Sequence, residues 1–204
     1  MLSKIKWLGH ATVMFTAPKI IYIDPYQLKG TPPKADIILI THDHYDHLSE
    51  PDIKKIRTAD TVIVIPESVK KSLPGNLRHI KIGETIRIAD ITVEAVPAYN
   101  TDKQFHPKSA HNVGYIVTID NTRYYHAGDT DIIPDMKNLK VDVAFLPVGG
   151  TYTMNPREAA EAAEKIQPKI AVPIHYNSIV GSSEDARLFK ELCSCPVEIL
   201  TEGA

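Results

Sequence analysis

One apolar run of the sequence leads without interruption into a group of side chains that can bind metal ions. Ile37–Ile40 has the composition of a strand that is buried on both faces. Four potential ligands follow within six residues, namely His42, His44, Asp46 and His47. In an extended segment His42 and His44 point to the same side, because side chains alternate with a period of two residues. Asp46 and His47 follow where the chain turns, so they can reach a second ion beside the first.

This segment predicts a centre that holds two divalent metal ions. Two ions about 3.5–4 Å apart can share one hydroxide and stabilise both the attacking and the leaving oxygen of a hydrolytic reaction. Imidazole combined with carboxylate suits zinc, and manganese or iron could also bind. The alternative is a polar surface loop that is merely rich in histidine. The ligand types, their spacing and the preceding apolar strand together favour the metal site.

Two later loops offer matching side chains. Tyr124–Thr130 ends in Gly128-Asp129, and Ile170–Asn177 is a second apolar strand that ends in His175. Alone, a Gly-Asp pair is typical of a turn, and a single histidine at a strand end is typical of a structural hydrogen bond. Beside the first segment both become candidate ligands, because such sites gather side chains from several strand ends. Asp129 could bridge the two ions.

Short apolar runs broken by Gly, Pro, Asp and Asn predict a chain of many strands and few helices. The expected strands are Lys4–Leu8, Thr12–Thr16, Ile20–Ile23, Ile37–Ile40, Thr61–Ile65, Thr85–Ile88, Thr92–Val96, Val113–Ile119, Arg123–His126, Val143–Leu146, Ile170–Pro173 and Val197–Leu200. The expected helices are Pro51–Arg57, Asn155–Gln167 and Ser183–Leu192. No linker divides the chain. We expect one domain over residues 1–204, with mixed sheets covered by helices, in the α+β or α/β class.

Composition excludes several classes of protein. The chain has 204 residues, 43% of them hydrophobic and 24% charged, and a formal net charge of -2. A near-neutral chain has no broad basic surface, so a dedicated nucleic-acid binder is not expected. No apolar run is long enough to cross a bilayer, and the first residues do not resemble a signal peptide. Cys193 and Cys195 form no disulfide framework. We therefore expect a cytoplasmic protein without membrane partners; the sequence does not indicate its oligomeric state.

With these motifs identified, the chain resembles the metallo-β-lactamase superfamily. Its H-x-H-x-D-H motif corresponds to His42–His47, its bridging aspartate to Asp129 and its last histidine to His175. Further motifs are similar to those of small metal-dependent hydrolases related to L-ascorbate 6-phosphate lactonase: Trp7–His10, Ile23–Pro25, His126–Thr130, Leu146–Gly150 and Pro173–Tyr176. The resemblance implies the α+β fold of that superfamily, an αββα four-layer sandwich with two mixed sheets, helices outside and the site at one edge.

One ligand of the resembled family is missing from its expected place. A further histidine usually precedes the bridging aspartate, and here the corresponding residue is Asn100 in Val96–Asn100. An amide oxygen is a poor zinc ligand beside imidazole. We expect His106 to replace it, since His106 lies in a loop that can fold back over the site. His111, immediately before a strand, is the second candidate.

The complete set implied by the resemblance divides the ligands between two ions. His42, His44 and His106 would hold the first ion, Asp46, His47 and His175 the second, and Asp129 would lie between them. Asp46 and Asp129 are the expected catalytic residues, and Asp46 could also pass a proton. Asp24 and His126 are expected to support ligands. His10 is equally compatible with a supporting, a substrate-facing or a structural role. Solvated surface is the simplest interpretation of Lys103, Lys108, Tyr152 and Arg157, although they could contact an anionic substrate.

The resulting functional hypothesis is a hydrolase that attacks a small substrate with a metal-bound hydroxide. The resemblance favours the C–O bond of a lactone, ester or phosphoester, and the substrate could be anionic. One alternative is a nuclease or phosphodiesterase, which would need a basic track that the composition does not show. A second alternative is an iron-binding redox or sensor protein on the same fold. A closed structural metal site is the least favoured, since such a site is normally four-coordinate.

Overall fold

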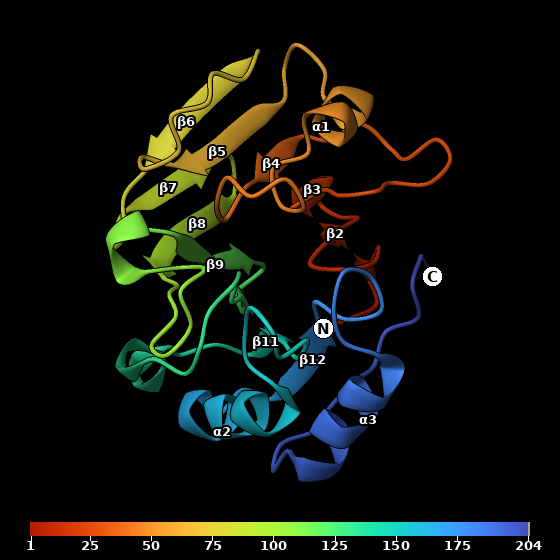
Figure 1. The fold of residues 1–204 in the computed structure, drawn as a ribbon. Coiled ribbons are helices and arrows are strands. Elements are labelled where there is room, and N and C mark those ends of the chain that lie inside the picture. Colours follow the sequence, from red (N-terminus) through yellow and green to blue (C-terminus); the bar gives the residue numbers. More distant parts are fainter. Residues whose placement is uncertain (204) are drawn as a thin grey trace.

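Two six-stranded sheets face one another, with helices on their outer sides (Figure 1). The computed structural model describes residues 1–203, apart from the side chain of Asn138. The first sheet has the order β1 (Ile5–Trp7), β2 (Val13–Phe15), β3 (Ile21–Ile23), β4 (Ile37–Leu39), β5 (Val62–Pro66), β6 (Asn76–Ile80). The second has the order β12 (Ile170–Ile174), β11 (Val143–Pro147), β10 (Thr122–His126), β9 (Val113–Ile119), β8 (Ile91–Pro97), β7 (Thr85–Ile88).

Both sheets are mixed in the same way. In the first, β1, β2 and β3 pair antiparallel, and β4, β5 and β6 then continue parallel to β3. In the second, β7 to β10 pair antiparallel, and β11 and β12 continue parallel to β10. The hairpin between β9 and β10 turns at Asp120-Asn121, where both residues have positive φ, as expected from their turn propensity. Each sheet therefore has a hairpin followed by parallel strands, and the ends of those strands carry the candidate ligands.

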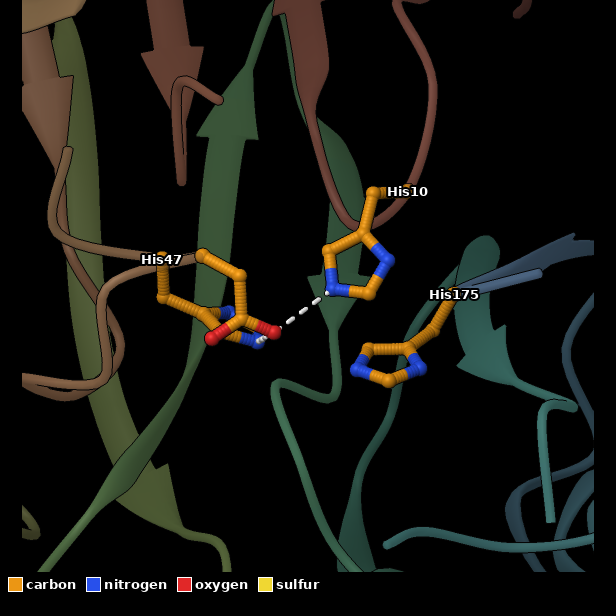
Figure 2. A group of neighbouring side chains, drawn as sticks. His10, His47 and His175 are labelled. Atoms are coloured by element: carbon orange, nitrogen blue, oxygen red, sulfur yellow. Dashed lines mark hydrogen bonds and ion pairs between the residues drawn. The ribbon is translucent and has the colours of Figure 1, made fainter. Parts of the chain in front are cut away.

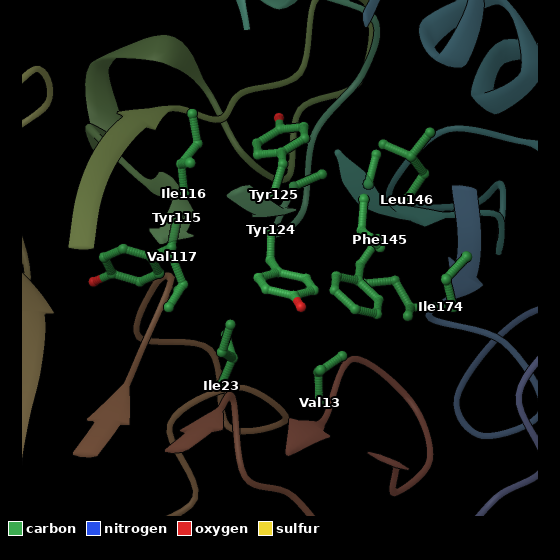
Figure 3. Packing of buried hydrophobic residues seen from close by; sticks show 14 of the residues in the cluster. Val13, Ile23, Tyr115, Ile116, Val117, Tyr124, Tyr125, Phe145, Leu146 and Ile174 are labelled. Carbon is green, nitrogen blue, oxygen red and sulfur yellow. The ribbon is translucent and has the colours of Figure 1, made fainter. Parts of the chain in front are cut away.

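The alternating side chains of the strands build two layers of core. Val13 and Ile23 of the first sheet face Tyr124 and Phe145 of the second, and together they fill the space between the sheets (Figure 3). The intervening residues of the first sheet, such as Ile38, point outward and pack in a second cluster. Strand β4 is therefore apolar on both faces because each face has a packing partner.

Three α-helices form the outer layers. Helix α1 (Glu50–Ile56) covers the first sheet through Ile53 and Ile56. Helices α2 (Pro156–Ile166) and α3 (Ser183–Leu192) lie on the second sheet (Figure 1). Asn155 caps α2, since its side chain accepts from the backbone of Glu158 while Glu158 accepts from the backbone of Asn155. Short 3₁₀ turns span η1 (Lys108–Ala110) and η2 (Pro134–Asn138). The expected four-layer αββα architecture with two mixed sheets is confirmed.

The strands differ from the expected ones in two places. Asn76–Ile80 is strand β6, which the sequence pattern did not predict, because an edge strand with largely exposed side chains lacks an apolar run. The expected strand Val197–Leu200 is reduced to one bridge between Val197 and Ala171. This short apolar segment packs against the core cluster that fills the space between the sheets, without extending the second sheet. Among the described residues, no helix combines the length and apolarity needed to span a bilayer.

Candidate metal centre

A buried aspartate fixes the loop that follows β4. The Thr41 backbone N–H donates to Asp24 Oδ1 (2.8 Å), and the Thr41 hydroxyl donates to Asp24 Oδ2 (2.6 Å). Asp24 Oδ2 also lies 2.7 Å from Nδ1 of His47. A carboxylate on one ring nitrogen sets the orientation of the imidazole and leaves Nε2 for another partner. Asp24 thus supports a candidate ligand, as the sequence indicated.

Three histidines converge at one end of the cluster. Nδ1 of His44 lies 3.1 Å from Nε2 of His42 and 3.1 Å from Nε2 of His106. His106 Nε2 is also 3.4 Å from Asp129 Oδ2. Nitrogens that surround one zinc ion at about 2.0–2.1 Å lie roughly 3.3 Å apart, so these separations suit a shared ion.

The structure places His106, and not His111, in this group. Asn100 accepts at Oδ1 from the His106 backbone N–H (2.9 Å), and the same oxygen lies 3.1 Å from ring Nδ1 of His106. The Asn100 amide donates to the Tyr152 carbonyl at 3.0 Å. Asn100 therefore orients His106 and does not replace it. His111 is exposed and lines a surface hollow with Glu67 and Lys81.

Three more candidate ligands meet at the other end. Asp129 Oδ1 lies 3.3 Å from Nε2 of His47, and Oδ2 lies 3.2 Å from Nε2 of His175. Asp46 Oδ2 is 3.7 Å from Nε2 of His47. Asp129 faces ligands at both ends of the cluster, which is the position a bridging carboxylate would need. The seven residues singled out from the sequence are thus brought together: His42, His44, Asp46, His47, His106, Asp129 and His175.

His10 joins this end of the cluster, which the sequence left undecided. It is 2% exposed, and its Nε2 lies 2.9 Å from Asp46 Oδ2. Figure 2 shows its ring between His47 and His175. His10 and His175 have ring centroids 4.0 Å apart. The Trp7–His10 motif marks the segment, but the sequence could not decide the role of His10, because its partner Asp46 lies far along the chain.

The donor atoms fit metal ions. Among the described residues, five of the six buried side-chain nitrogens and oxygens without a hydrogen-bond partner belong to this cluster: His10 Nδ1, His47 Nε2, Asp129 Oδ1, and His175 Nδ1 and Nε2. A buried polar atom without a partner costs about 1–3 kcal/mol, so such atoms rarely accumulate without a reason. Divalent cations held between His47, Asp129 and His175 would satisfy His47 Nε2, Asp129 Oδ1 and His175 Nε2, and the imidazole–carboxylate set is one that zinc accepts.

Burial and the neighbouring carboxylates set the protonation of the cluster. Burial lowers the pKa of His10 to about 4, and it also lowers the pKa of His42 and of His106. Burial acts in the same direction on His47, but the charges of Asp129 and Asp24 outweigh it and raise the His47 pKa well above its usual range. Burial would raise the pKa of Asp129, and the attraction of His175 and His47 instead holds it well below the ordinary value.

His126 and Gly128 shape the turn that presents Asp129. His126 Nε2 lies 2.8 Å from the Ala11 carbonyl, and its Nδ1 accepts from the Gly128 backbone N–H at 3.2 Å. Gly128 has φ +64°, and a Cβ there would lie 2.9 Å from the Val113 carbonyl oxygen. Only glycine fits this turn without strain. His126 therefore supports Asp129 from outside the cluster.

Of the three basic side chains that could have bound an anion, the two lysines are already engaged, whereas Arg157 is exposed. Lys103 donates to Asp131 at 2.6 Å and to Asp102 at 3.0 Å. The Lys108 ammonium lies 4.7 Å from the centre of the Tyr99 ring. Exposed aromatic side chains flank the cluster in sequence instead: Tyr45 beside His44 and Phe105 beside His106.

Comparison with known proteins agrees with this geometry. A family model described as a beta-lactamase superfamily domain matches residues 4–175. The chain belongs to the beta-lactamase superfamily. Within that superfamily it is 32% identical to a UPF0173 metal-dependent hydrolase of Thermococcus onnurineus, over 98% of this chain and 96% of the relative. It is 35% identical to one of Pyrococcus horikoshii, with 98% and 96% covered.

Solved structures of the superfamily share the fold along nearly the whole chain. A protein of Parabacteroides distasonis, described as a metal-dependent hydrolase, superposes with a TM-score of 0.86 at 40% identity, covering 97% of this chain and 93% of the other. Igni18, a metallo hydrolase from Ignicoccus hospitalis, superposes with a TM-score of 0.79 at 23% identity, covering 98% and 95%. The similarity to the lactonase branch remains a prediction.

Proposed function

We propose that the protein is a hydrolase that uses two divalent metal ions, most readily zinc, to cleave a small uncharged ester or lactone. The observation that carries this proposal is the buried cluster in which Asp129 lies within 3.4 Å of imidazoles at both ends. Relatives over nearly the full length are named metal-dependent hydrolases, which supports the reaction class.

The first ion would be held by His42, His44 and His106, and the second by Asp46, His47 and His175, with Asp129 shared. When bound, such ions lower the pKa of water and polarise the group under attack. Asp46 is the proposed proton acceptor. The hydrogen bond with His10 overcomes the effect of burial and lowers the pKa of Asp46, so its carboxylate is ionised at neutral pH.

The engaged lysines favour an uncharged ester or lactone over a phosphoester. Free cationic side chains would strengthen the binding of a phosphate group, but Lys103 is held by Asp102 and Asp131, and Lys108 lies over Tyr99. Exposed Tyr45 and Phe105 offer apolar surface instead. The same arrangement disfavours a nuclease or phosphodiesterase.

The test compares metal content with hydrolysis in the same preparations. The protein is stripped with a chelator, reloaded with zinc, manganese or iron, and assayed on lactones, carboxylic esters, thioesters, phosphomonoesters and phosphodiesters. We expect up to two ions per chain and zinc-dependent cleavage of esters or lactones. Wild-type protein that takes up none of these metals contradicts the metal site. A coloured iron protein without hydrolytic activity would support the redox alternative.

Two variants separate metal binding from chemistry. His42→Ala with His44→Ala should empty at least one site. Asp46→Asn should reduce turnover by about 10²-fold or more, because an amide accepts no proton and binds metal weakly. His79→Gln is a matched control, since His79 is exposed on β6 and contributes nothing to the cluster. Full activity after exhaustive chelation would refute the mechanism.

A further inference from the structure

We infer that His10 is a positioning residue that holds Asp46 through one ring nitrogen and offers the other to a hydroxyl group of the substrate. This inference rests on the proposed function and narrows its substrate class to small, uncharged, hydroxyl-bearing esters or lactones.

His10 is fixed in place by its own backbone. Its carbonyl oxygen accepts from the indole N–H of Trp7 at 2.8 Å and from the backbone N–H of His175 at 2.8 Å. Its φ of +49° belongs to the left-handed region, which costs a non-glycine residue free energy and is retained where surrounding contacts impose it. The Gly9-His10 turn is therefore tied directly to the end of β12, where His175 is presented.

The hydrogen bond to Asp46 determines which nitrogen of His10 carries the proton. An ionised carboxylate can only accept, so the 2.9 Å contact requires an N–H at Nε2 of His10. In the neutral imidazole with its proton on Nε2, the other ring nitrogen carries no proton. Nδ1 is then a bare acceptor. It is buried and has no partner among the described residues.

His10 also lines a small polar hollow of about 100 Å³. The ring turns Nε2 toward the cluster, and Nδ1 lies on the opposite edge (Figure 2). The remaining lining includes Tyr26, Gln27, Asn177 and Ser178, whose side chains can donate and accept hydrogen bonds.

The charges at this hollow cancel. Lys29 and Glu202 both line it, and they form an ion pair with each other. An anionic group would compete with Glu202 for Lys29, and a cationic group would compete with Lys29 for Glu202, whereas a hydroxyl group would compete with neither. A hydroxyl can donate to His10 Nδ1 and accept from Asn177 or Ser178. A polar, uncharged hollow with one buried acceptor therefore selects a hydroxyl-bearing substituent.

The positioning role is tested by metal affinity, without any need for turnover. His10→Ala should weaken zinc binding at the second site by about 10–100-fold, the usual effect of losing a group that orients a ligand. His10→Gln should recover most of this loss, because the amide can again donate to Asp46. Zinc competition with a chelator and the absorption spectrum of the cobalt-loaded protein report the site. An equal loss of zinc affinity in both variants would indicate that His10 itself binds the metal. Unchanged zinc affinity in both would show that His10 does not position Asp46. Each of these results overturns the inference.

The hollow is tested by binding of slowly hydrolysed substrate analogues to the zinc-loaded protein. The probes are 2-pyrrolidinone and its hydroxylated derivatives, and dissociation constants are measured by NMR titration. We expect one hydroxylated isomer to bind about tenfold more tightly than the parent lactam, in line with one additional hydrogen bond. Asn177→Ala combined with Ser178→Ala should remove that preference and leave zinc affinity unchanged.

The outcomes separate this inference from the proposed function. Equal affinity for all of the lactams, in a protein that binds zinc and cleaves lactones, overturns the hydroxyl site alone. A protein that binds zinc and shows the hydroxyl preference, but cleaves no ester or lactone, contradicts the proposed reaction and leaves the binding inference standing.

Discussion

At the scale of single residues, His106 and Asn100 divide a task that the resembled family assigns to one histidine. Asn100 stands at the expected position but accepts hydrogen bonds from His106, which lies six residues later and is the candidate ligand. His106→Ala should lower zinc affinity at the first site by at least about 10–100-fold, taking loss of a supporting partner as the lower bound. Chelator competition measures this change. The exposed His111 provides the control, and an equal effect of His111→Ala would contradict the assignment.

His47 predicts how metal binding depends on pH. Asp129 and Asp24 raise the pKa of His47 well above its usual range in the metal-free protein, despite burial. A proton therefore competes with metal for Nε2 up to that raised pKa, and binding must release it. Above the ordinary histidine pKa of about 6.5, where an unperturbed histidine is already neutral, zinc affinity should still rise with pH. Calorimetry in buffers of different ionisation enthalpy counts the proton released. Affinity that does not change across this range contradicts the prediction.

The sequence was informative about residues whose role follows from local pattern. His42–His47 follow an apolar strand, and Asp129 and His175 end two others, so ligand type, position at strand ends and the family resemblance together predicted that they share one site. His10 could not be assigned, because its partner Asp46 lies 36 residues away and its backbone is held by Trp7 and His175. The role of Asn100 was equally hidden, since it depends on how the loop to His106 folds.

At the scale of elements, strands buried on both faces were the most predictable and edge strands the least. Strand β4 could be predicted from its continuous apolar run, because side chains on both of its faces are buried. Strand β6, at the edge of its sheet, mixes polar and apolar side chains and has no such run. Helix α2 could be bounded by its capping box and by the following proline. The turn after β10 was only partly predictable. The sequence shows its Gly-Asp pair, but the crowding at Gly128 arises from Val113 and Thr41, which lie elsewhere in the chain.

Gly128→Ala should disturb both stability and the metal centre. The added Cβ would lie 2.9 Å from the Val113 carbonyl oxygen and 3.2 Å from Thr41 Cβ, at a backbone φ of +64°. The left-handed conformation alone costs about 1–2 kcal/mol, and the contacts add to this cost. We expect a lower melting temperature and weaker zinc binding, because relief of the contact moves Asp129. Gly30→Ala is the matched control: Gly30 has φ +62° and nothing within 4 Å of an added Cβ. If both variants bind zinc equally well, the crowding does not position Asp129.

At the scale of the whole molecule, the candidate metal centre takes its residues from both sheets. His42, His44, Asp46 and His47 follow β4 of the first sheet, while Asp129 follows β10 and His175 follows β12 of the second. His106 lies between β8 and β9, also of the second sheet. An ion held by ligands from both sheets opposes their separation, which unfolding requires. Metal binding is therefore expected to stabilise the sandwich as a unit.

Zinc should accordingly raise the melting temperature of the intact chain. A ligand that binds only the folded state at 100 times its dissociation constant adds about 2.7 kcal/mol to the free energy of unfolding. For a domain of this size, each kcal/mol corresponds to roughly 2–4 °C, so a gain of about 5–11 °C is expected for one such site. Thermal unfolding followed by circular dichroism, with zinc and with excess chelator, measures the gain. The variant with both His42→Ala and His44→Ala should fold without metal and gain less than wild type, because only the second site could remain. Equal melting temperatures with and without bound zinc would show that the ions do not stabilise the contact between the sheets.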